Sequence, residues 1–269
     1  MKFDSLTTRK YNLHSHTQFC DGRHSMEEIL RAAIDEGMTL FGFSPHSPVP
    51  VDSPCNMSFD DVEPYFDEIQ RLRSLYGDQI EILASMEIDY LGDKWGPANP
   101  YFDNLPLDYR IGSVHFVPSA IDGTPIDIDG SAERFFKNMT EQFDNNIDYV
   151  VNAFFDASEA MVEAGGLDII GHFDKVIMNG IEYDPNLADS SIYRRRVKRM
   201  IDCIASADIA AEINTKAIDT RGRFFPDSSL FHAMKRAGIT ILVNSDVHFS
   251  NLVNAGRDKA FAILDNLSI

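Results

Sequence analysis

The feature that most constrains this chain is an alternation of short β-prone runs with helical segments, which continues almost from end to end. Such alternation is typical of βα units wound around a parallel sheet. Strands are expected near Tyr11–His14, Leu40–Ser44, Glu81–Met86, Tyr109–Val114, Asp168–Gly171, Ile209–Ile213 and Ile239–Asn244. We therefore expect an α/β fold, an irregular seven-stranded (β/α)7 TIM-like barrel. Because about 250 residues commonly form one barrel domain, residues 1–269 are expected to be a single domain.

The helices between these strands are marked by their end signals. Ser25 and Glu28 have the spacing of a capping box, and glycines stand where several of the helices should stop. Helices are expected over residues 25–37, 58–77 and 227–238, and over 131–165 in two parts divided at Asn145 and Asn146. The long loop 91–106 has the composition of a lid or binding loop.

The formal net charge of −18 restricts the partners of the chain. It would repel polyanions, so nucleic acid is an unlikely partner, whereas a small anionic substrate stays possible if bound cations reverse the local field. No run approaches the roughly 20 apolar residues that span a bilayer, so no membrane partner is expected. The scattered Cys20, Cys55 and Cys203 fit the reducing cytoplasm. No pattern predicts an oligomeric state.

Six of the eight histidines fall at or just beyond the C-terminal end of an expected strand. These ends make up about a tenth of such a barrel and carry the active sites of barrel enzymes, so chance would place about one histidine there. One histidine at a strand end is more often a hydrogen-bonded structural residue, but convergence from several strands indicates a site. The six are His14, His16, His46, His115, His172 and His248.

Carboxylates join these histidines at the same strand ends. Glu87 closes the third strand, Asp246 precedes His248 by two positions, and Asp21 follows the first strand. Residues two apart on an extended segment point the same way, which explains the HxH and DxH spacings. Imidazole and carboxylate suit Zn, Fe and Mn, and nine such groups exceed the coordination shell of one ion. We therefore expect two to three divalent transition metal ions at the C-terminal face of the strands.

The ordered series LHSHT, CDG, SPHSP, SMEIDY, IGSVHF, DIIGHFDK, AEINT and NSDVHF resembles the polymerase-and-histidinol-phosphatase (PHP) superfamily over nearly the whole chain. CDG, IGSVHF and AEINT favour its histidinol-phosphatase branch. The resemblance implies a first metal held by His14, His16, Glu87 and Asp246, a second held by Glu87, His115 and His172, and a third held by Asp21, His46 and His248. Many members carry histidine where this chain has Asp21.

The resemblance also implies a phosphomonoesterase that hydrolyses L-histidinol phosphate to L-histidinol and phosphate in histidine biosynthesis. A hydroxide bridging two metals, spaced by Glu87, would attack the phosphorus, and the ions would neutralise the phosphoryl oxygens. The leaving alkoxide needs a proton, for which Asp246 or His248 is best placed. Two alternatives stay open: a phosphoesterase of the same type acting on nucleotides or short oligonucleotides, and a non-catalytic metal-binding domain.

Recognition of the substrate beyond the metals calls for further charged residues. The cations that follow the last three strands are Lys175, Lys216, Arg221, Arg223 and Arg257. We favour Lys175 and Arg221 as substrate-binding residues, since arginine is the better bidentate partner for phosphate. The acidic residues expected to meet the cationic end of the substrate are Asp89, Asp93 and Asp122. His24 and His232 lie outside the pattern and are expected to face solvent or to serve local packing.

Overall fold

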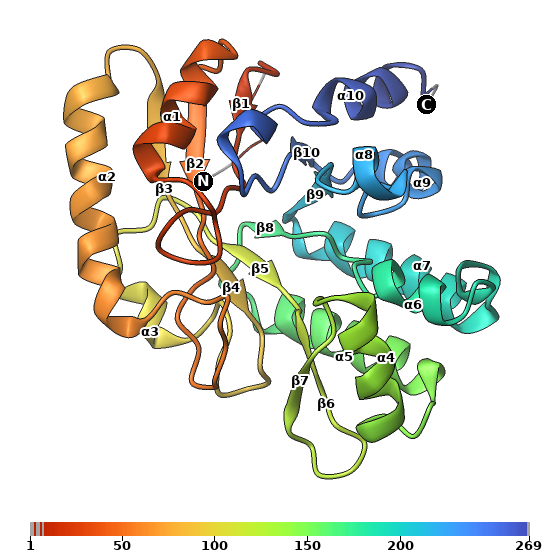
Figure 1. Ribbon diagram of the computed structural model, residues 1–269. Helices are drawn as coiled ribbons and strands as arrows, with labels where there is room; N and C mark the ends of the chain where they lie inside the picture. The colour runs from red at the N-terminus through yellow and green to blue at the C-terminus, as the bar shows by residue number, and fades with distance from the viewer. Residues whose placement is uncertain (1–2, 4–5, 7, 268–269) are drawn as a thin grey trace.

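The structure is a computed structural model that describes Phe3, Leu6 and residues 8–267. Parallel strands lie at its centre, with helices around them (Figure 1). One sheet has the order β1 (Tyr11–Asn12), β2 (Leu40–Phe43), β3 (Glu81–Ala84). The other has the order β10 (Ile241–Asn244), β9 (Ala210–Asn214), β8 (Ile169–Ile170), β5 (Ile111–Ser113), β4 (Glu87–Asp89). All pairings within the two sheets are parallel, so the predicted α/β fold is confirmed.

The third expected strand, residues 81–86, is divided in the structure. Its first part, β3, pairs with β2, and β4 begins at Glu87 and pairs with β5. At the break the carbonyl of Ser85 accepts a hydrogen bond at 2.9 Å from the hydroxyl of Tyr65, a buried helical side chain. Ser85 N–H still donates to the Phe43 carbonyl of β2, but its own carbonyl is taken by Tyr65, so the ladder between β2 and β3 is interrupted there.

Over residues 8–267 the two sheets do not join into one closed barrel. Each of the two seams between them carries only an isolated parallel bridge, one from His46 to Glu87 and one from Ser15 to Val247. Of the expected irregular seven-stranded TIM-like barrel, the α/β fold with parallel strands is therefore confirmed, but closure of the strands into a barrel is not found in these residues. The expected strand positions are found, but two of the contacts around the ring are single bridges between irregular segments.

The helices surround the strands, as Figure 1 shows. They are α1 (Met26–Asp35), α2 (Val62–Tyr76), α3 (Pro100–Asp103), α4 (Ala132–Glu141), α5 (Ile147–Ala164), α6 (Ile177–Tyr183), α7 (Ser191–Ala207), α8 (Ile218–Arg221), α9 (Phe231–Arg236) and α10 (Arg257–Asp265). The predicted capping box of Ser25 and Glu28 is confirmed, and Asn146 caps α5 at the predicted division. In the part of the chain that is described, none of the helices has both the length and the apolar character needed to cross a membrane.

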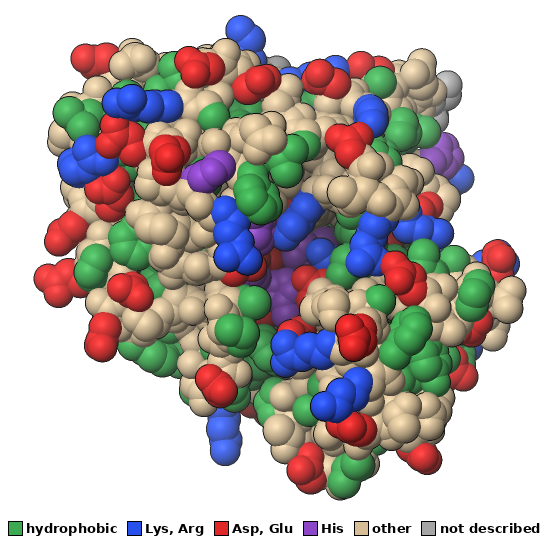
Figure 2. Space-filling view, viewed as in Figure 1, with side chains coloured by type: hydrophobic (Ala, Val, Ile, Leu, Met, Phe, Trp, Pro, Cys, Tyr) green, Lys and Arg blue, Asp and Glu red, His purple; other side chains and the backbone are tan. Residues whose placement is uncertain are grey.

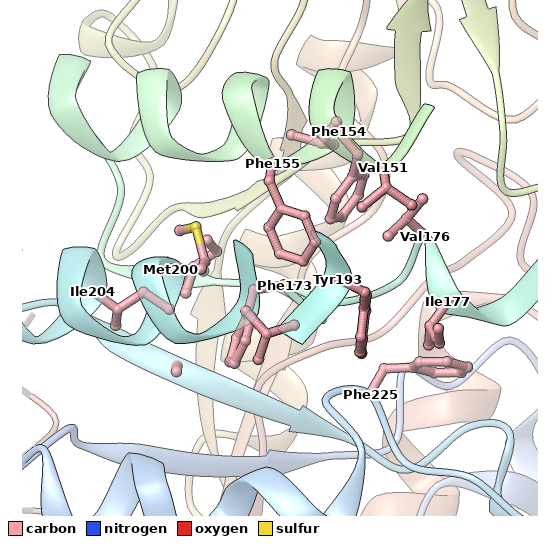
Figure 3. Packing of buried hydrophobic residues seen from close by; sticks show 14 of the residues in the cluster. Val151, Phe154, Phe155, Phe173, Val176, Ile177, Tyr193, Met200, Ile204 and Phe225 are labelled. Carbon is pink, nitrogen blue, oxygen red and sulfur yellow. The ribbon is translucent and has the colours of Figure 1, made fainter. Parts of the chain in front are cut away.

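The largest apolar cluster lies where α5 and α7 pack together beside the second sheet. Figure 3 shows Phe154 and Phe155 of α5 among side chains that include Met200 of α7. Burial of side chains of this size contributes about 1.5–3 kcal/mol each. Phe173 belongs to the same cluster, so the packing also fixes the backbone of its neighbour His172 at the end of β8.

An antiparallel hairpin that the sequence did not predict follows His115. It consists of β6 (Phe116–Pro118) and β7 (Pro125–Asp127). Proline cannot donate to a strand ladder, so the two prolines in the hairpin discourage a strand prediction. The hairpin matters for the site because Asp127 and the nearby Asp129 line the cavity at the strand ends.

A close contact in β2 provides a test of the packing. A Cβ atom on Gly42 would lie 1.9 Å from the hydroxyl oxygen of Tyr109, which is buried and donates to the carbonyl of Leu13. We expect Gly42→Ala to lower the free energy of unfolding by about 1–3 kcal/mol, measured by urea denaturation. In a Tyr109→Phe background the same substitution should cost less, because the clashing oxygen is gone. An equal cost in both backgrounds would contradict the packing described.

Candidate metal centre

The nine residues predicted as metal ligands converge at the C-terminal ends of the parallel strands. Eight of them line a cavity of about 220 Å³, and His14 lies in contact with them. Figure 2 shows histidine side chains at the bottom of a hollow in this face, with lysine or arginine side chains around it. The cavity-lining members are His16, Asp21, His46, Glu87, His115, His172, Asp246 and His248.

Glu87, at the start of β4, lies at the centre of this cluster and is 1% exposed. Its Oε2 is 3.2 Å from His14 Nε2 and 3.1 Å from His46 Nδ1. Its Oε1 is 2.9 Å from His172 Nε2 and 3.5 Å from His115 Nε2. Burial alone would raise the pKa of Glu87, but the neighbouring histidines outweigh burial and hold that pKa well below its usual value. Oε2 is also 3.5 Å from His16 Nε2, so this one buried carboxylate contacts five imidazoles, three through Oε2 and two through Oε1.

A second carboxylate, Asp246, organises the other half of the cluster. Its Oδ1 is 3.0 Å from His16 Nε2 and 3.4 Å from His248 Nδ1. Asp21 completes this half, with Oδ2 3.3 Å from His248 Nε2 and Oδ1 3.5 Å from His16 Nδ1. Asp246 has a φ of 49°, which is uncommon for a residue other than glycine and is frequent at functional sites.

Buried carboxylates behind two of the histidines orient their rings. Glu212 of β9 lies with Oε2 2.7 Å from His14 Nδ1 and accepts a hydrogen bond from the Asn244 amide at 3.0 Å. Asp89 lies with Oδ1 2.7 Å from His115 Nδ1. Such partners fix the ring orientation of a metal-binding histidine and increase its basicity. Asp89, which was expected to meet the substrate, contacts His115 and also lines the cavity.

Glu212 was not among the residues predicted for the site from the sequence. A signal for it was nevertheless present, since a carboxylate inside the apolar strand run IAAEIN must be buried and therefore needs a partner. In the structure Glu212 is fully buried.

The residues present fit a set of bound cations. Among the described residues, three buried atoms of the cluster lie near charged groups but form no hydrogen bond with them: Asp21 Oδ1, His46 Nδ1 and Asp246 Oδ1. Leaving such polar atoms unpaired costs about 1–3 kcal/mol each, and this cost is removed if the atoms bind an ion. Candidate ligand atoms lie within 4.8 Å of one another in the groups His16/Asp21/His46/His248, His14/His16/Asp246 and His46/Glu87/His115. His172 contacts Glu87 but is outside these groups.

The two residues predicted to bind substrate, Lys175 and Arg221, lie in different surroundings. Lys175 is buried with Nζ 3.5 Å from Asp129 Oδ1, next to the cavity but not lining it. Arg221, at the end of α8, pairs with Glu182 and lies outside the cavity lining, so its position gives no support to the prediction that it binds substrate. Lys216, which was not favoured, lines the cavity.

Two acidic residues and two histidines that were named from the sequence lie outside the cavity lining. Asp93 and Asp122 do not line the cavity, and Asp122 instead accepts a hydrogen bond from Thr124 N in the turn of the hairpin. His24 accepts a hydrogen bond from Ser250 N at 2.8 Å, and His232 is an exposed residue of α9. Both histidines therefore have the local surroundings that were expected of them.

A parallel α/β fold with a cluster of histidines and carboxylates at the C-terminal ends of its strands defines a metal-binding protein of the α/β class. The family can be given more closely, since the PHP domain model matches residues 12–216. The chain belongs to the PHP domain family.

Three known proteins are similar to the chain over most of its length. One, from Schizosaccharomyces pombe, is described as a probable histidinol-phosphatase and is 27% identical over 271 residues, which cover 95% of this chain and 86% of that protein. A solved structure of a Listeria monocytogenes protein, provisionally assigned as a histidinol phosphatase, has a TM-score of 0.82 at 19% identity and covers 93% of this chain and 99% of that one. The Lactococcus lactis histidinol phosphate phosphatase, solved with zinc, L-histidinol and phosphate, has a TM-score of 0.73 at 22% identity and covers 96% and 93%. The two structural likenesses establish the fold.

The contact between Glu212 and His14 gives a prediction about metal affinity. Glu212→Gln removes the carboxylate charge behind His14, so we expect the affinity for Zn or Mn to fall by about 10- to 100-fold, measured by competition with a chromophoric chelator. The matched control is Glu81→Gln, the same change at an exposed position of β3. Equal affinities of the folded Glu212→Gln variant and of the control would show that Glu212 does not support the site.

Proposed function

We propose that the protein is a metal-dependent phosphomonoesterase of the histidinol-phosphatase branch, which hydrolyses L-histidinol phosphate to L-histidinol and phosphate in histidine biosynthesis. The observation that carries the proposal is the buried Glu87, which contacts five histidines inside a cavity at the strand ends. Similarity to the Lactococcus lactis phosphatase with bound zinc, L-histidinol and phosphate supports the choice of substrate.

The nine converging residues would hold two to three divalent transition metal ions, Zn, Fe or Mn. The proposed ligands are His14, His16, Glu87 and Asp246 for the first, Glu87, His115 and His172 for the second, and Asp21, His46 and His248 for the third. Ions of this kind, when bound, lower the pKa of water and neutralise phosphoryl oxygens. The short contacts of both Glu87 oxygens support a bridging role, and the unpartnered Asp21 Oδ1 supports the third site.

The chain's own residues would position the substrate and deliver a proton to the leaving oxygen. Asp246 is held by its surroundings, since Oδ2 accepts a hydrogen bond from the Asn214 amide and Oδ1 lies 3.0 Å from His16 Nε2 without forming a hydrogen bond. His248 is less buried and lines the cavity, with Nε2 beside Asp21. We therefore assign proton delivery to His248 in the form of the site that holds two ions, since the third ion would take His248 as a ligand.

The proposed substrate is a small phosphorylated molecule in the cytoplasm. The net charge of −18 disfavours a polyanionic substrate such as nucleic acid. A cavity of about 220 Å³ also favours a small ligand. The three cysteines are unpaired, which supports a reducing compartment.

Substrate choice is tested by phosphate release from the metal-loaded protein. We expect kcat/KM for L-histidinol phosphate to exceed that for p-nitrophenyl phosphate or a nucleoside monophosphate by at least about 100-fold, because polar contacts to the amino-imidazole part would discriminate against ligands that leave them unpaired. The variant Glu87→Gln, purified in parallel, controls for contaminating phosphatases. Comparable values for the three substrates would overturn the histidinol assignment, and a preference for oligonucleotides would favour a nucleic-acid phosphoesterase.

A further inference from the structure

Lys216 lies two residues after the end of β9 and is held where the chain leaves the sheet. Its backbone N–H donates to the side chain of Asn214 at 3.1 Å, and the preceding Thr215 N–H donates to the Asn244 carbonyl of β10. The side chain extends into the cavity, where Nζ lies 3.1 Å from His248 Nε2 and 3.5 Å from Asp246 Oδ1. A cation is thus fixed at the edge of the metal-ligand cluster.

No other lysine or arginine of the described residues lines this cavity. Lys175 is buried against Asp129, and Arg223 pairs with Asp227 in another surface groove. Arg257 is buried beneath the strands, where it donates to the Val243 carbonyl. Of the five lysine and arginine residues that follow the last three strands, only Lys216 lines the cavity.

The ammonium of Lys216 also has donors left for a ligand. An ammonium carries three N–H donors, and the only contact of Nζ within hydrogen-bonding range that the structure gives, among the residues it describes, is with His248. The 3.5 Å separation from Asp246 Oδ1 is longer than a charge-assisted hydrogen bond. A side chain that is 40% exposed can adjust to an incoming group without a large desolvation cost.

The charge around the cavity explains why such a cation is needed. Several carboxylates line it, namely Asp21, Glu87, Asp89, Asp127, Asp129 and Asp246. Together they would repel a phosphate dianion unless cations oppose their field. Lysine binds phosphate as a compact point charge, and the position of Lys216 beside His248 places that charge next to the metal ligands.

We propose that Lys216 binds the phosphoryl oxygens of the substrate and of the product phosphate, and so supplies the phosphate-binding cation of this site. The inference rests on the proposed function, because it concerns the same cavity. Lys216 thus takes the phosphate-binding role that was predicted for Arg221, which pairs with Glu182. Lys175 is a buried neighbour of the site and pairs with Asp129.

The test measures the Kd of inorganic phosphate for the metal-loaded protein by isothermal titration calorimetry, together with metal content by elemental analysis. Lys216→Met should weaken phosphate binding by about 10- to 100-fold, as loss of a hydrogen bond to a charged group predicts, with metal content unchanged. Lys216→Arg should keep the charge and bind phosphate within a few-fold of wild type. The matched control Lys259→Met changes an exposed lysine of α10 that pairs with Asp219, and it should bind phosphate normally.

Unchanged phosphate binding in Lys216→Met would overturn the proposal, as would a loss of bound metal in that variant, because Lys216 would then act by holding the ligands. A loss of phosphate binding in Lys175→Met or Arg221→Met, with Lys216→Met unaffected, would overturn it in favour of those residues. The assay uses phosphate itself, so it reads the role of Lys216 even if L-histidinol phosphate is not hydrolysed. Failure of the proposed function would appear only in the phosphate-release assay.

Discussion

The structure depends most on the burial of the Glu87 carboxylate among imidazoles. Taking a carboxylate out of water costs several kcal/mol unless opposite charges and hydrogen bonds compensate. Glu87 reaches this position because the third expected strand breaks before it. The backbone N–H of Glu87 then donates to Pro45 and its carbonyl accepts from Ser47, across the seam beside β2. One irregularity of the sheet therefore builds the centre of the site.

The second seam carries the other half of the cluster. His16 N–H donates to the Val247 carbonyl at 2.8 Å, so the segment after β1 runs beside the segment after β10. On each segment, the side chains of residues two apart point the same way. Ser15 separates His14 from His16, and Val247 separates Asp246 from His248. The two places where the ring of strands is irregular are thus the two places where candidate ligands meet. Regular pairing there would constrain the backbone to a strand geometry and would not allow the φ of 49° at Asp246.

The strands and the candidate ligands could be predicted from the sequence because both depend on local patterns. Strand positions follow from apolar runs, and the ligand candidates follow from histidines at the ends of those runs. Side-chain contacts that depend on the path of the chain after a strand could not be predicted from the sequence. The short helix α8 carries Arg221 to Glu182, and the ring of His115 takes Asp89 as its partner. The hairpin that brings Asp127 and Asp129 to the cavity was missed because its prolines oppose a strand prediction.

The residues around Glu87 and Asp246 are proposed to form a multinuclear metal centre. Elemental analysis of the protein after reconstitution with Zn or Mn measures this. We expect two to three equivalents of transition metal per chain, since nine converging N and O ligands exceed one coordination shell, and fewer equivalents in Glu87→Gln. Less than one equivalent in the wild-type protein after reconstitution would contradict it.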